Sequence, residues 1–346
     1  MASPRGTIFL TGANGGLGCG IVSKIISTPE LAGHHGIYAV RNASSAAALK
    51  STLRKAPTSH TYDIISLELY KLANVREVVD AINSRVAKGK VPPIRALILN
   101  AGYNDLGHES FTEEGFETSF VANYLGHWLL TLKLLQSMDA ENGRVVVVSS
   151  NSYDVNHPVH NIDGYYKEEK WKVFFREDNI DAIAKGTWSS NKDDLPRKAG
   201  TRRYGVAKMC AVMMVLELQR RLDADPALKG ISLVTIDPGS MGTGLTRRGS
   251  WFIRTILFPM IVPLLAPLLT WLNPNGDVRT VSKSSNDVVE AAFETGPRLR
   301  GKYLNGSELQ EIVPEALDAK KRAMVWRDSV KYTNLTEQDT PLINWK

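Results

Sequence analysis

A glycine-rich segment close to the start of the chain places the strongest limit on the fold. It joins an apolar run at residues 5–11 to an apolar-periodic run at residues 21–26, which predicts a strand, a tight turn and a helix. Glycine allows the backbone to turn sharply and to approach a pyrophosphate, whose charge is favoured by the first N–H groups of a helix. The residues expected to line such a site are Gly12, Asn14, Gly15, Gly16, Leu17 and Gly18. A plain tight turn is the structural alternative.

Strands and helices are predicted to alternate along the rest of the chain. Apolar runs at residues 36–40, 64–69, 94–99, 144–148 and 231–236 are typical of buried parallel strands, and a short edge strand is expected at residues 302–304. Helical spacing occurs at residues 75–86, 113–138, 285–293 and 315–330. This order predicts an α/β fold with a Rossmann-type doubly wound parallel sheet. We expect one domain over residues 1–346, with ligands at the carboxyl ends of the strands.

The composition fits a large globular chain and limits its partners. The 346 residues are 43% hydrophobic, and 42 basic against 36 acidic residues give a net charge of +6. The charges are scattered without a basic run, which argues against nucleic acid as a partner. Two cysteines do not make a disulfide framework, and no charged and apolar leader precedes the first strand, so we expect a cytoplasmic protein.

Side chains at the ends of three predicted strands are candidates for cofactor contacts. Arg41 follows the second strand, where a carboxylate would bind the ribose of NAD, and its charge instead suits the 2'-phosphate of NADP(H). A solvated surface arginine is the alternative. Glu68 and Leu69 end the third strand, near the expected adenine edge. The fourth strand runs into three small residues that leave room for a cofactor, Asn100, Ala101 and Gly102.

The pair Tyr204 and Lys208 is the candidate for proton chemistry. The two side chains are four residues apart in a strongly helical segment and therefore share one face of the helix. A neighbouring cation favours the phenolate and lowers the pKa of a tyrosine, which makes Tyr204 a candidate general acid or base. The same spacing also occurs by chance in amphipathic helices.

Two other polar positions adjoin the expected site. Asn123 lies among apolar residues of the predicted helix 113–138, where it either caps a backbone carbonyl or holds a water near the site. Ser149 and Ser150 follow the fifth strand, where a hydroxyl can orient a substrate oxygen.

The chain resembles the short-chain dehydrogenase/reductase family over residues 5–330, because its motifs occur in the order that is typical of that family. They are Thr11-Gly12-x-x-x-Gly16-x-Gly18, Asn100-Ala101-Gly102, Asn123, Ser150 and Tyr204-x-x-x-Lys208, followed by Pro238-Gly239 where the family places its nicotinamide-side loop. The segment after the second strand and Gly301-Lys302-Tyr303 are similar to the NADPH-using retinol dehydrogenase and protochlorophyllide reductase group.

The resemblance implies a role for each catalytic candidate. Tyr204 would donate or accept the proton, and Lys208 would lower its pKa while binding the nicotinamide ribose. Ser150 would orient the substrate carbonyl, with Ser149 as its nearest rival. Asn123 would hold a water that links Lys208 to solvent.

The segment between Ser150 and Tyr204 is longer than in simple members of the family. Residues 151–203 are polar and aromatic, and they form either a surface excursion with a small aromatic cluster or a wall of the substrate pocket. We expect part of this insertion to form a wall of the substrate pocket, because both of its ends adjoin candidate catalytic residues. His157 and His160 lie here without a third ligand at suitable spacing, so no metal site is predicted.

Residues 246–280 are predicted to form an apolar substrate lid. The stretch 255–272 is uncharged and carries prolines at four-residue intervals, which argue against a regular membrane span. Three alternatives stay open: a kinked lid over an apolar pocket, a lid that also touches a membrane face through residues 251–272, and a true span. Each of them implies a hydrophobic substrate.

These observations predict an NADP(H)-dependent oxidoreductase. The expected reaction reduces a carbonyl, or oxidises the corresponding alcohol, on a mid-sized hydrophobic small molecule. Two other functions stay open: a cofactor-binding fold relative that carries out a non-redox isomerisation or cyclisation, and a non-catalytic binding protein.

Overall fold

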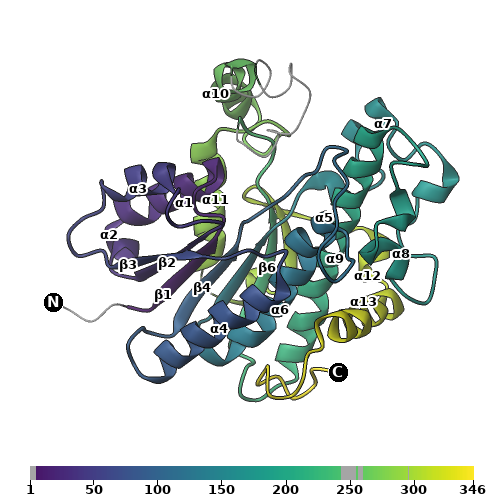
Figure 1. The fold of residues 1–346 in the computed structure, drawn as a ribbon. Coiled ribbons are helices and arrows are strands. Elements are labelled where there is room, and N and C mark those ends of the chain that lie inside the picture. Colours follow the sequence, from purple (N-terminus) through teal and green to yellow (C-terminus); the bar gives the residue numbers. More distant parts are fainter. Residues whose placement is uncertain (1–4, 243–254, 256–259, 295) are drawn as a thin grey trace.

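A single sheet runs through the computed structural model, which describes residues 5–242, 255, 260–294 and 296–346 (Figure 1). Its strands within these residues are β1 (Thr7–Thr11), β2 (His35–Val40), β3 (Tyr62–Ser66), β4 (Ile94–Leu99), β5 (Arg144–Val148), β6 (Ser232–Asp237), β7 (Lys302–Asn305) and β8 (Glu308–Gln310). They lie in the order β3-β2-β1-β4-β5-β6-β7-β8. All neighbours are parallel except β7 and β8, which are antiparallel.

Helices cover both faces of the sheet. One face carries α1 (Gly16–Ser27), α3 (Ala47–Leu53) and α11 (Val281–Phe293), and the other carries α4 (Leu72–Ala87), α6 (Gly126–Leu134) and α9 (Pro196–Asp223). In β1, Ile8 and Leu10 pack in the core beneath α1, α3 and α11. Phe9 packs in the core beneath α4, α6 and α9, as the two-residue period of a strand requires. This is the predicted doubly wound α/β fold. The remaining helices are α2 (Pro29–Ala32), α5 (Thr118–Phe120), α7 (Pro158–Asp163), α8 (Asp181–Ala184), α10 (Val262–Leu272), α12 (Pro314–Leu317) and α13 (Ala319–Thr333).

The parallel strands predicted from apolar runs are all present, with small shifts at their ends. The expected edge strand at residues 302–304 is wrong in its position within the sheet. It forms β7, which lies inside the sheet because β8 pairs along its outer side. All three residues of β8 are exposed, so no buried face marked this strand in the sequence.

The predicted helix at residues 113–138 starts too early. Gly115 adopts a left-handed φ of 82°, and the helix begins at α5 after the side chain of Glu117 accepts hydrogen bonds from the N–H groups of Ser119 and Phe120. It continues through a π-helical segment, Val121–Leu125, into α6 and ends in a 3-10 turn, Leu135–Ser137. The predicted helix 315–330 is also two helices, because Asp318 caps the N-terminus of α13.

The insertion at residues 151–203 is held together by aromatic contacts. Besides α7 and α8 it contains 3-10 turns at Asn151–Tyr153, Glu169–Trp171 and Thr187–Ser189. The ring of Trp188 lies 5.2 Å from that of Trp171 and 5.4 Å from that of Phe174. From Pro196 onward the segment already forms the first turns of α9, the helix that carries Tyr204 and Lys208.

The predicted lid is described only in part. Residues 246–254 and 256–259 lie outside the described residues. The main element in the described part of the predicted lid is α10. Among the residues that the structure does describe, no helix combines the length and apolar character needed to cross a membrane.

Candidate active site

A cleft of about 1560 Å³ opens at the carboxyl ends of the central strands. Residues at or just after the ends of β1, β2, β4, β5 and β6 line it. The strand order reverses between β1 and β4, and ligands of doubly wound sheets bind at such a reversal.

The cleft brings together the residues that the sequence predicted for a cofactor and three of the four catalytic candidates. They are Gly12, Asn14, Gly15, Gly16, Leu17, Gly18, Arg41, Glu68, Leu69, Asn100, Ala101, Gly102, Ser150, Tyr204, Lys208, Pro238 and Gly239. The exception is Asn123, which lies behind the cleft wall, where its neighbour Ala122 contributes to the lining.

The glycine-rich turn fits a pyrophosphate. Gly12 has a left-handed φ of 68°, and a Cβ added to it would lie 2.8 Å from the Cα of Ala101, so a side chain has no room there. Helix α1 begins at Gly16 with no side-chain cap and no acidic residue in its first turn. Its first N–H groups and the positive end of its dipole are therefore available to an anion.

Hydrogen bonds join the ends of β1 and β4 into the floor of the cleft. The Asn100 side-chain amide donates to the carbonyl oxygen of Thr11 at 2.9 Å. The Thr11 hydroxyl accepts a bond from the N–H of Ala101 at 3.0 Å. These two hydrogen bonds hold the floor of the cleft in place.

The cleft rim at β2 and β3 carries both a cation and a carboxylate. Arg41 is exposed directly after β2 and lines the cleft. Glu68 accepts hydrogen bonds from the Tyr70 hydroxyl and from Lys71, and these bonds lower the pKa of Glu68. The contact predicted between Glu68 and an adenine edge stays a prediction.

Ser150, Tyr204 and Lys208 meet at the inner end of the cleft. The hydroxyl of Ser150 hydrogen-bonds that of Tyr204, whereas Ser149 faces Tyr303. Lys208 donates to the carbonyl oxygen of Val148 at 2.9 Å, and its ammonium lies 5.5 Å from the centre of the Tyr204 ring. The geometry therefore favours Ser150 over Ser149 as the hydroxyl next to Tyr204.

The pKa of Tyr204 is shifted in the direction opposite to that predicted. Burial raises it, the charge of Asp237 raises it further, and only the hydrogen bond with Ser150 lowers it. Burial lowers the pKa of Lys208 to about 8, against the charge of Asp237, which raises it. The predicted lowering of the Tyr204 pKa by Lys208 is wrong for this arrangement, in which burial and the charge of Asp237 set the shift. Tyr204 is a neutral phenol at pH 7, ready to donate a proton.

The side chain of Asn123 is occupied by protein partners. Its Oδ1 accepts from the N–H of Tyr103 at 2.9 Å, and its Nδ2 donates to the carbonyl oxygens of Tyr103 and Ser119. This is the carbonyl-capping alternative that the sequence left open. The role of Asn123 in holding a water stays a prediction.

Asp237, a buried carboxylate beside the catalytic candidates, was not predicted from the sequence. Its two oxygens accept from the N–H groups of Asn151 and Gly239, each at 2.8 Å, and burial raises its pKa. Gly239 has a left-handed φ of 70° and packs against the side chain of Arg279. The position of Asp237 immediately before the Pro238-Gly239 motif was the available signal.

His127 is a second missed residue, buried four positions after Asn123. Its Nε2 lies 3.1 Å from the hydroxyl of Thr11, and its ring also bonds the backbone of Asn123. Burial and the nearby charge of Lys208 lower the pKa of His127 to about 3, so the ring is neutral at pH 7. The neutral ring connects the π-helical segment to the cleft floor at Thr11.

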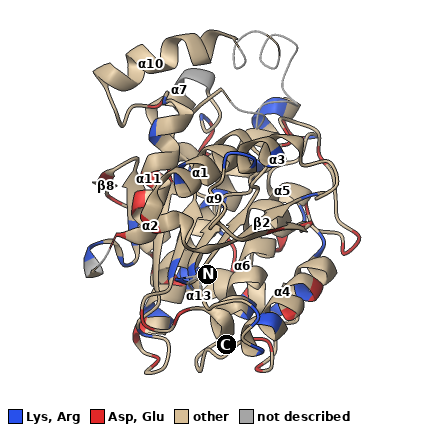
Figure 2. Cartoon of the chain, turned by 90° about the vertical axis from the view of Figure 1, so that its left-hand side faces the viewer, with Lys and Arg blue, Asp and Glu red and all other residues tan. Residues whose placement is uncertain are grey.

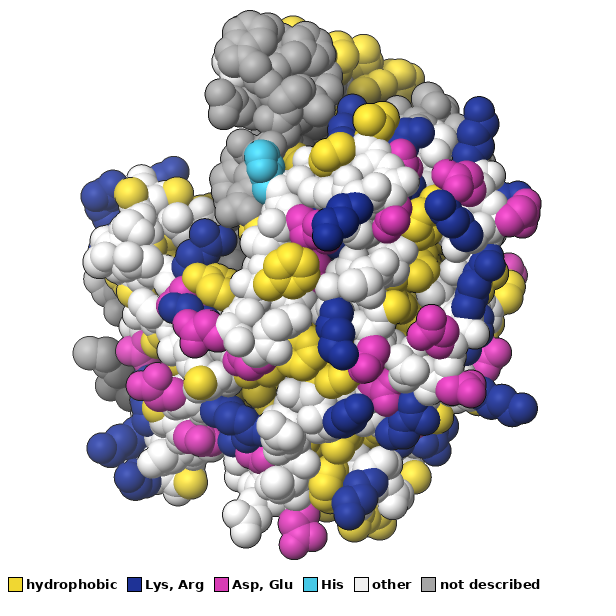
Figure 3. Space-filling view, turned by 45° about the vertical axis from the view of Figure 1, so that its right-hand side comes forward, with side chains coloured by type: hydrophobic (Ala, Val, Ile, Leu, Met, Phe, Trp, Pro, Cys, Tyr) yellow, Lys and Arg dark blue, Asp and Glu magenta, His cyan; other side chains and the backbone are white. Residues whose placement is uncertain are grey.

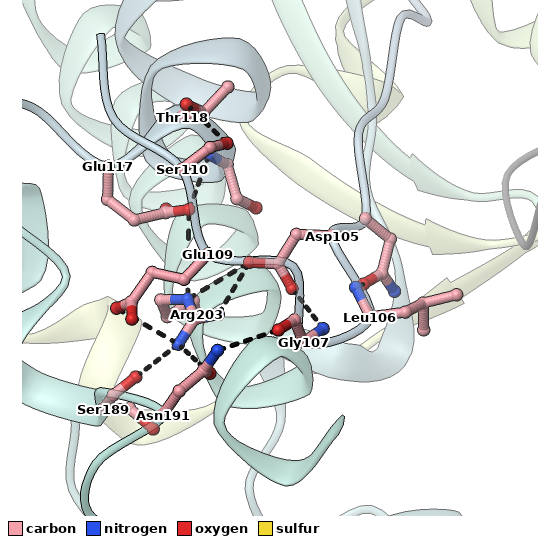
Figure 4. Close-up of polar contacts among 12 residues, drawn as sticks. Asp105, Leu106, Gly107, Glu109, Ser110, Glu117, Thr118, Ser189, Asn191 and Arg203 are labelled. Atoms are coloured by element: carbon pink, nitrogen blue, oxygen red, sulfur yellow. Dashed lines mark hydrogen bonds and ion pairs between the residues drawn. The ribbon is translucent and has the colours of Figure 1, made fainter. Parts of the chain in front are cut away.

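A buried ionic cluster lies next to Tyr204 in the chain (Figure 4). Arg203 donates to Asp105 at 2.7 Å, to the carbonyl oxygen of Ser189 at 2.7 Å and to Asn191 at 3.1 Å. Glu117 approaches the same guanidinium at 3.9 Å, and burial raises the pKa of Glu117 to about 7. The cluster ties α9 to the loop after β4 and to the insertion.

Within the described residues, no group of three or more histidine, cysteine, aspartate or glutamate side chains is arranged to hold a metal ion. His157 lies 3.8 Å from Asp277, and His160 lies 3.4 Å from the carbonyl oxygen of Asn151. Both histidines belong to the insertion beside the cleft.

A Rossmann-type sheet with an uncapped helix N-terminus and a buried tyrosine, serine and lysine at one cleft defines a dinucleotide-dependent oxidoreductase. The sequence profile described as short chain dehydrogenase matches residues 6–162. The protein named Short-chain dehydrogenase iccH of Talaromyces variabilis is 44% identical, over 99% of this chain and 99% of its own. The chain therefore belongs to the short-chain dehydrogenase/reductase family.

More distant relatives agree with this assignment. Retinol dehydrogenase 13 of Homo sapiens is 27% identical over 96% of this chain and 86% of its own. Protochlorophyllide reductase A of Arabidopsis thaliana is 27% identical over 96% and 77%. These two relatives support the predicted similarity to the retinol dehydrogenase and protochlorophyllide reductase group.

Solved structures share the fold. An NADPH-bound carbonyl reductase from chicken fatty liver superimposes with a TM-score of 0.56 at 14% identity, over 89% of this chain and 95% of that chain. The enzyme KRED1-Pglu superimposes with a TM-score of 0.53 at 17% identity, over 86% and 100%.

Proposed function

We propose that the protein uses NADPH to reduce a carbonyl group on a mid-sized, largely hydrophobic molecule, or carries out the reverse oxidation. The observation that carries this proposal is the position of the Tyr204 hydroxyl. It lies beside Ser150, and the Tyr204 ring lies beside the ammonium of Lys208, in the same cleft that receives the N-terminus of α1.

Charge at the rim supports NADP(H) over NAD(H). Arg41 is exposed after β2, and the chain continues with Asn42 and Ala43, so no carboxylate occupies the position that would bind a ribose hydroxyl. An arginine there can form charge-assisted bonds to the 2'-phosphate. Bound NADPH would supply the hydride.

The protonation state of Tyr204 supports reduction as the favoured direction. A neutral phenol can give its proton to the oxygen of a carbonyl as that oxygen gains negative charge. Ser150 can donate a hydrogen bond to the same oxygen and so orient it. Lys208, whose ammonium lies 5.5 Å from the centre of the Tyr204 ring, is a cation available to the phenolate that remains.

The outer part of the cleft supports a mainly hydrophobic substrate with a few polar groups. Aromatic and aliphatic lining residues there are Tyr103, Phe111, Val159, Tyr165 and Met241. Polar lining residues in the same region are Asn104, His108, Glu109 and His160. Val159, His160 and Tyr165 come from the insertion, which is consistent with its predicted role as a wall.

Stoichiometry tests the proposal. The purified protein would be given a panel of apolar ketones with NADPH or NADH, and both the loss of reduced nicotinamide absorbance and the product would be measured. We expect one NADPH consumed for each alcohol formed. Product formation without NADPH consumption would instead point to an isomerase or cyclase, and neither binding nor consumption of NADPH would defeat the proposal.

A further inference from the structure

Helix α10 presents apolar side chains to solvent along most of its length. The exposed fractions are 79% for Leu264, 57% for Leu268, 76% for Trp271 and 65% for Leu272, and Ala266 is the buried residue of the helix. Scattered exposed leucines are ordinary on protein surfaces, but a continuous patch marks a surface that binds something. Figure 3 shows apolar side chains gathered at the top of the molecule, where α10 lies.

The shape of this surface separates the candidate partners. Val262, Ala266 and Thr270, at four-residue spacing, form the least exposed stripe of α10. At 3.6 residues per turn, the remaining positions from Pro263 round to Leu269 span an arc of about 240°. A second protein copy, or the rim of the chain's own cleft, would cover only one side of so convex a surface. Acyl chains are fluid and can surround a helix on all of its outward sides.

The charge pattern points to the same partner. No Asp, Glu, Lys or Arg occurs from Thr255 to Gly276, and Figure 2 draws α10 in the colour of the uncharged residues. Between Asp237 and Asp277 the charged residues are all arginines, namely Arg247, Arg248 and Arg254. A basic and apolar sequence of this kind suits an interface with anionic head groups.

The length of α10 excludes a span by this helix. Eleven residues rise about 16 Å, against about 30 Å for the hydrocarbon core of a bilayer. An apolar helix of this length can lie within the interface, with its apolar side chains reaching into the acyl region.

We propose that α10 docks the protein on an anionic lipid bilayer, with the helix lying in the plane of the membrane and its leucines and Trp271 among the acyl chains. This inference is independent of the reaction at Tyr204, because it depends on the exposed surface of α10 and on the charge pattern of the sequence around it.

Vesicle flotation tests the docking. The full chain would be mixed with vesicles of phosphatidylcholine alone, or of phosphatidylcholine and phosphatidylserine in equal amounts. We expect the wild type to float with the mixed vesicles, and the double variant Leu268→Glu with Trp271→Glu to lose about tenfold or more of this binding. Leu317→Glu, at another exposed leucine (52%), is the matched control and should bind as wild type.

A spectroscopic readout locates the contact. Brominated lipid should quench the fluorescence of the wild type more than that of Trp271→Phe, since only a tryptophan within the bilayer is close to the bromine. Equal quenching in the two proteins would contradict insertion of α10.

Three flotation results would also overturn the proposal. They are no flotation with either vesicle, equal binding to both vesicle types, and unchanged binding by the double variant. Sedimentation velocity of the wild type and the double variant tests the alternative partner of α10, a second copy of the chain. A dimer that the double variant dissociates, in a protein that does not float, would identify a second copy as the partner of α10.

Discussion

Replacing Arg203 by methionine should destabilise the fold far more than the same change at an exposed arginine. Arg203, Asp105 and Glu117 are all buried, so the carboxylates cannot recover solvation when the guanidinium is lost. Removing one partner of a buried ion pair costs about 3–5 kcal/mol. Arg203 also donates to the carbonyl oxygen of Ser189 and to Asn191, so the loss should lie toward the upper end of this range.

The matched control lies on the same helix. Arg220 is 59% exposed, and its partner Glu217 keeps a second ion pair with Arg221 when Arg220 is replaced, so the loss should be about 0–1 kcal/mol. Urea unfolding of the wild type, Arg203→Met and Arg220→Met gives the two free-energy differences directly. A second variant, Arg203→Met combined with Asp105→Asn, should recover part of the lost stability because it removes one unpaired charge.

The refuting result is a loss below about 1 kcal/mol for Arg203→Met, equal to that of a surface pair. Such a value would mean that the cluster does not hold α9 against the loop after β4 and the insertion.

Arg41→Asp should weaken NADPH binding about tenfold to a hundredfold, the value of a charge-assisted bond, with NADH affected less; an unchanged cofactor preference in KM would contradict this. Asp237→Asn should move the alkaline limb of the pH profile of kcat to lower pH. The charge of Asp237 raises the pKa of Lys208, which is about 8, and the variant loses this effect. An unmoved limb would refute the influence of Asp237 on Lys208. Burial raises the pKa of Asp339, but a hydrogen bond from Lys133 helps to bring this pKa down to about 2. Its contribution to stability is therefore present above pH ~4 and lost as the pH falls toward 2, and Asp339→Asn should remove this acid dependence in unfolding measurements.

The strands β1, β4 and β5 could be predicted because each is an apolar run buried along nearly all of its length. The cofactor side of the cleft could be predicted for a related reason. Its residues follow the ends of those strands directly, so their positions in the chain determine their positions in space. Strand β8 carried no such signal, because it is short and fully exposed.

The rest of the site depends on contacts between distant segments. Arg203 meets Asp105 and Asn191 through folding of the insertion, and no spacing in the sequence brings these three side chains together. The pKa of Tyr204 was predicted from its helical neighbour Lys208 alone. The actual shift is set by burial and by Asp237, which belongs to β6, and neither is visible in the local sequence.

The most direct test of the account is the turnover of Tyr204→Phe. Its kcat for carbonyl reduction should fall by about a hundredfold to ten-thousandfold, the usual contribution of a positioned proton donor, while the Kd for NADPH stays close to that of the wild type. Retained turnover in a variant that still binds NADPH would contradict the claim that the Tyr204 hydroxyl supplies the proton.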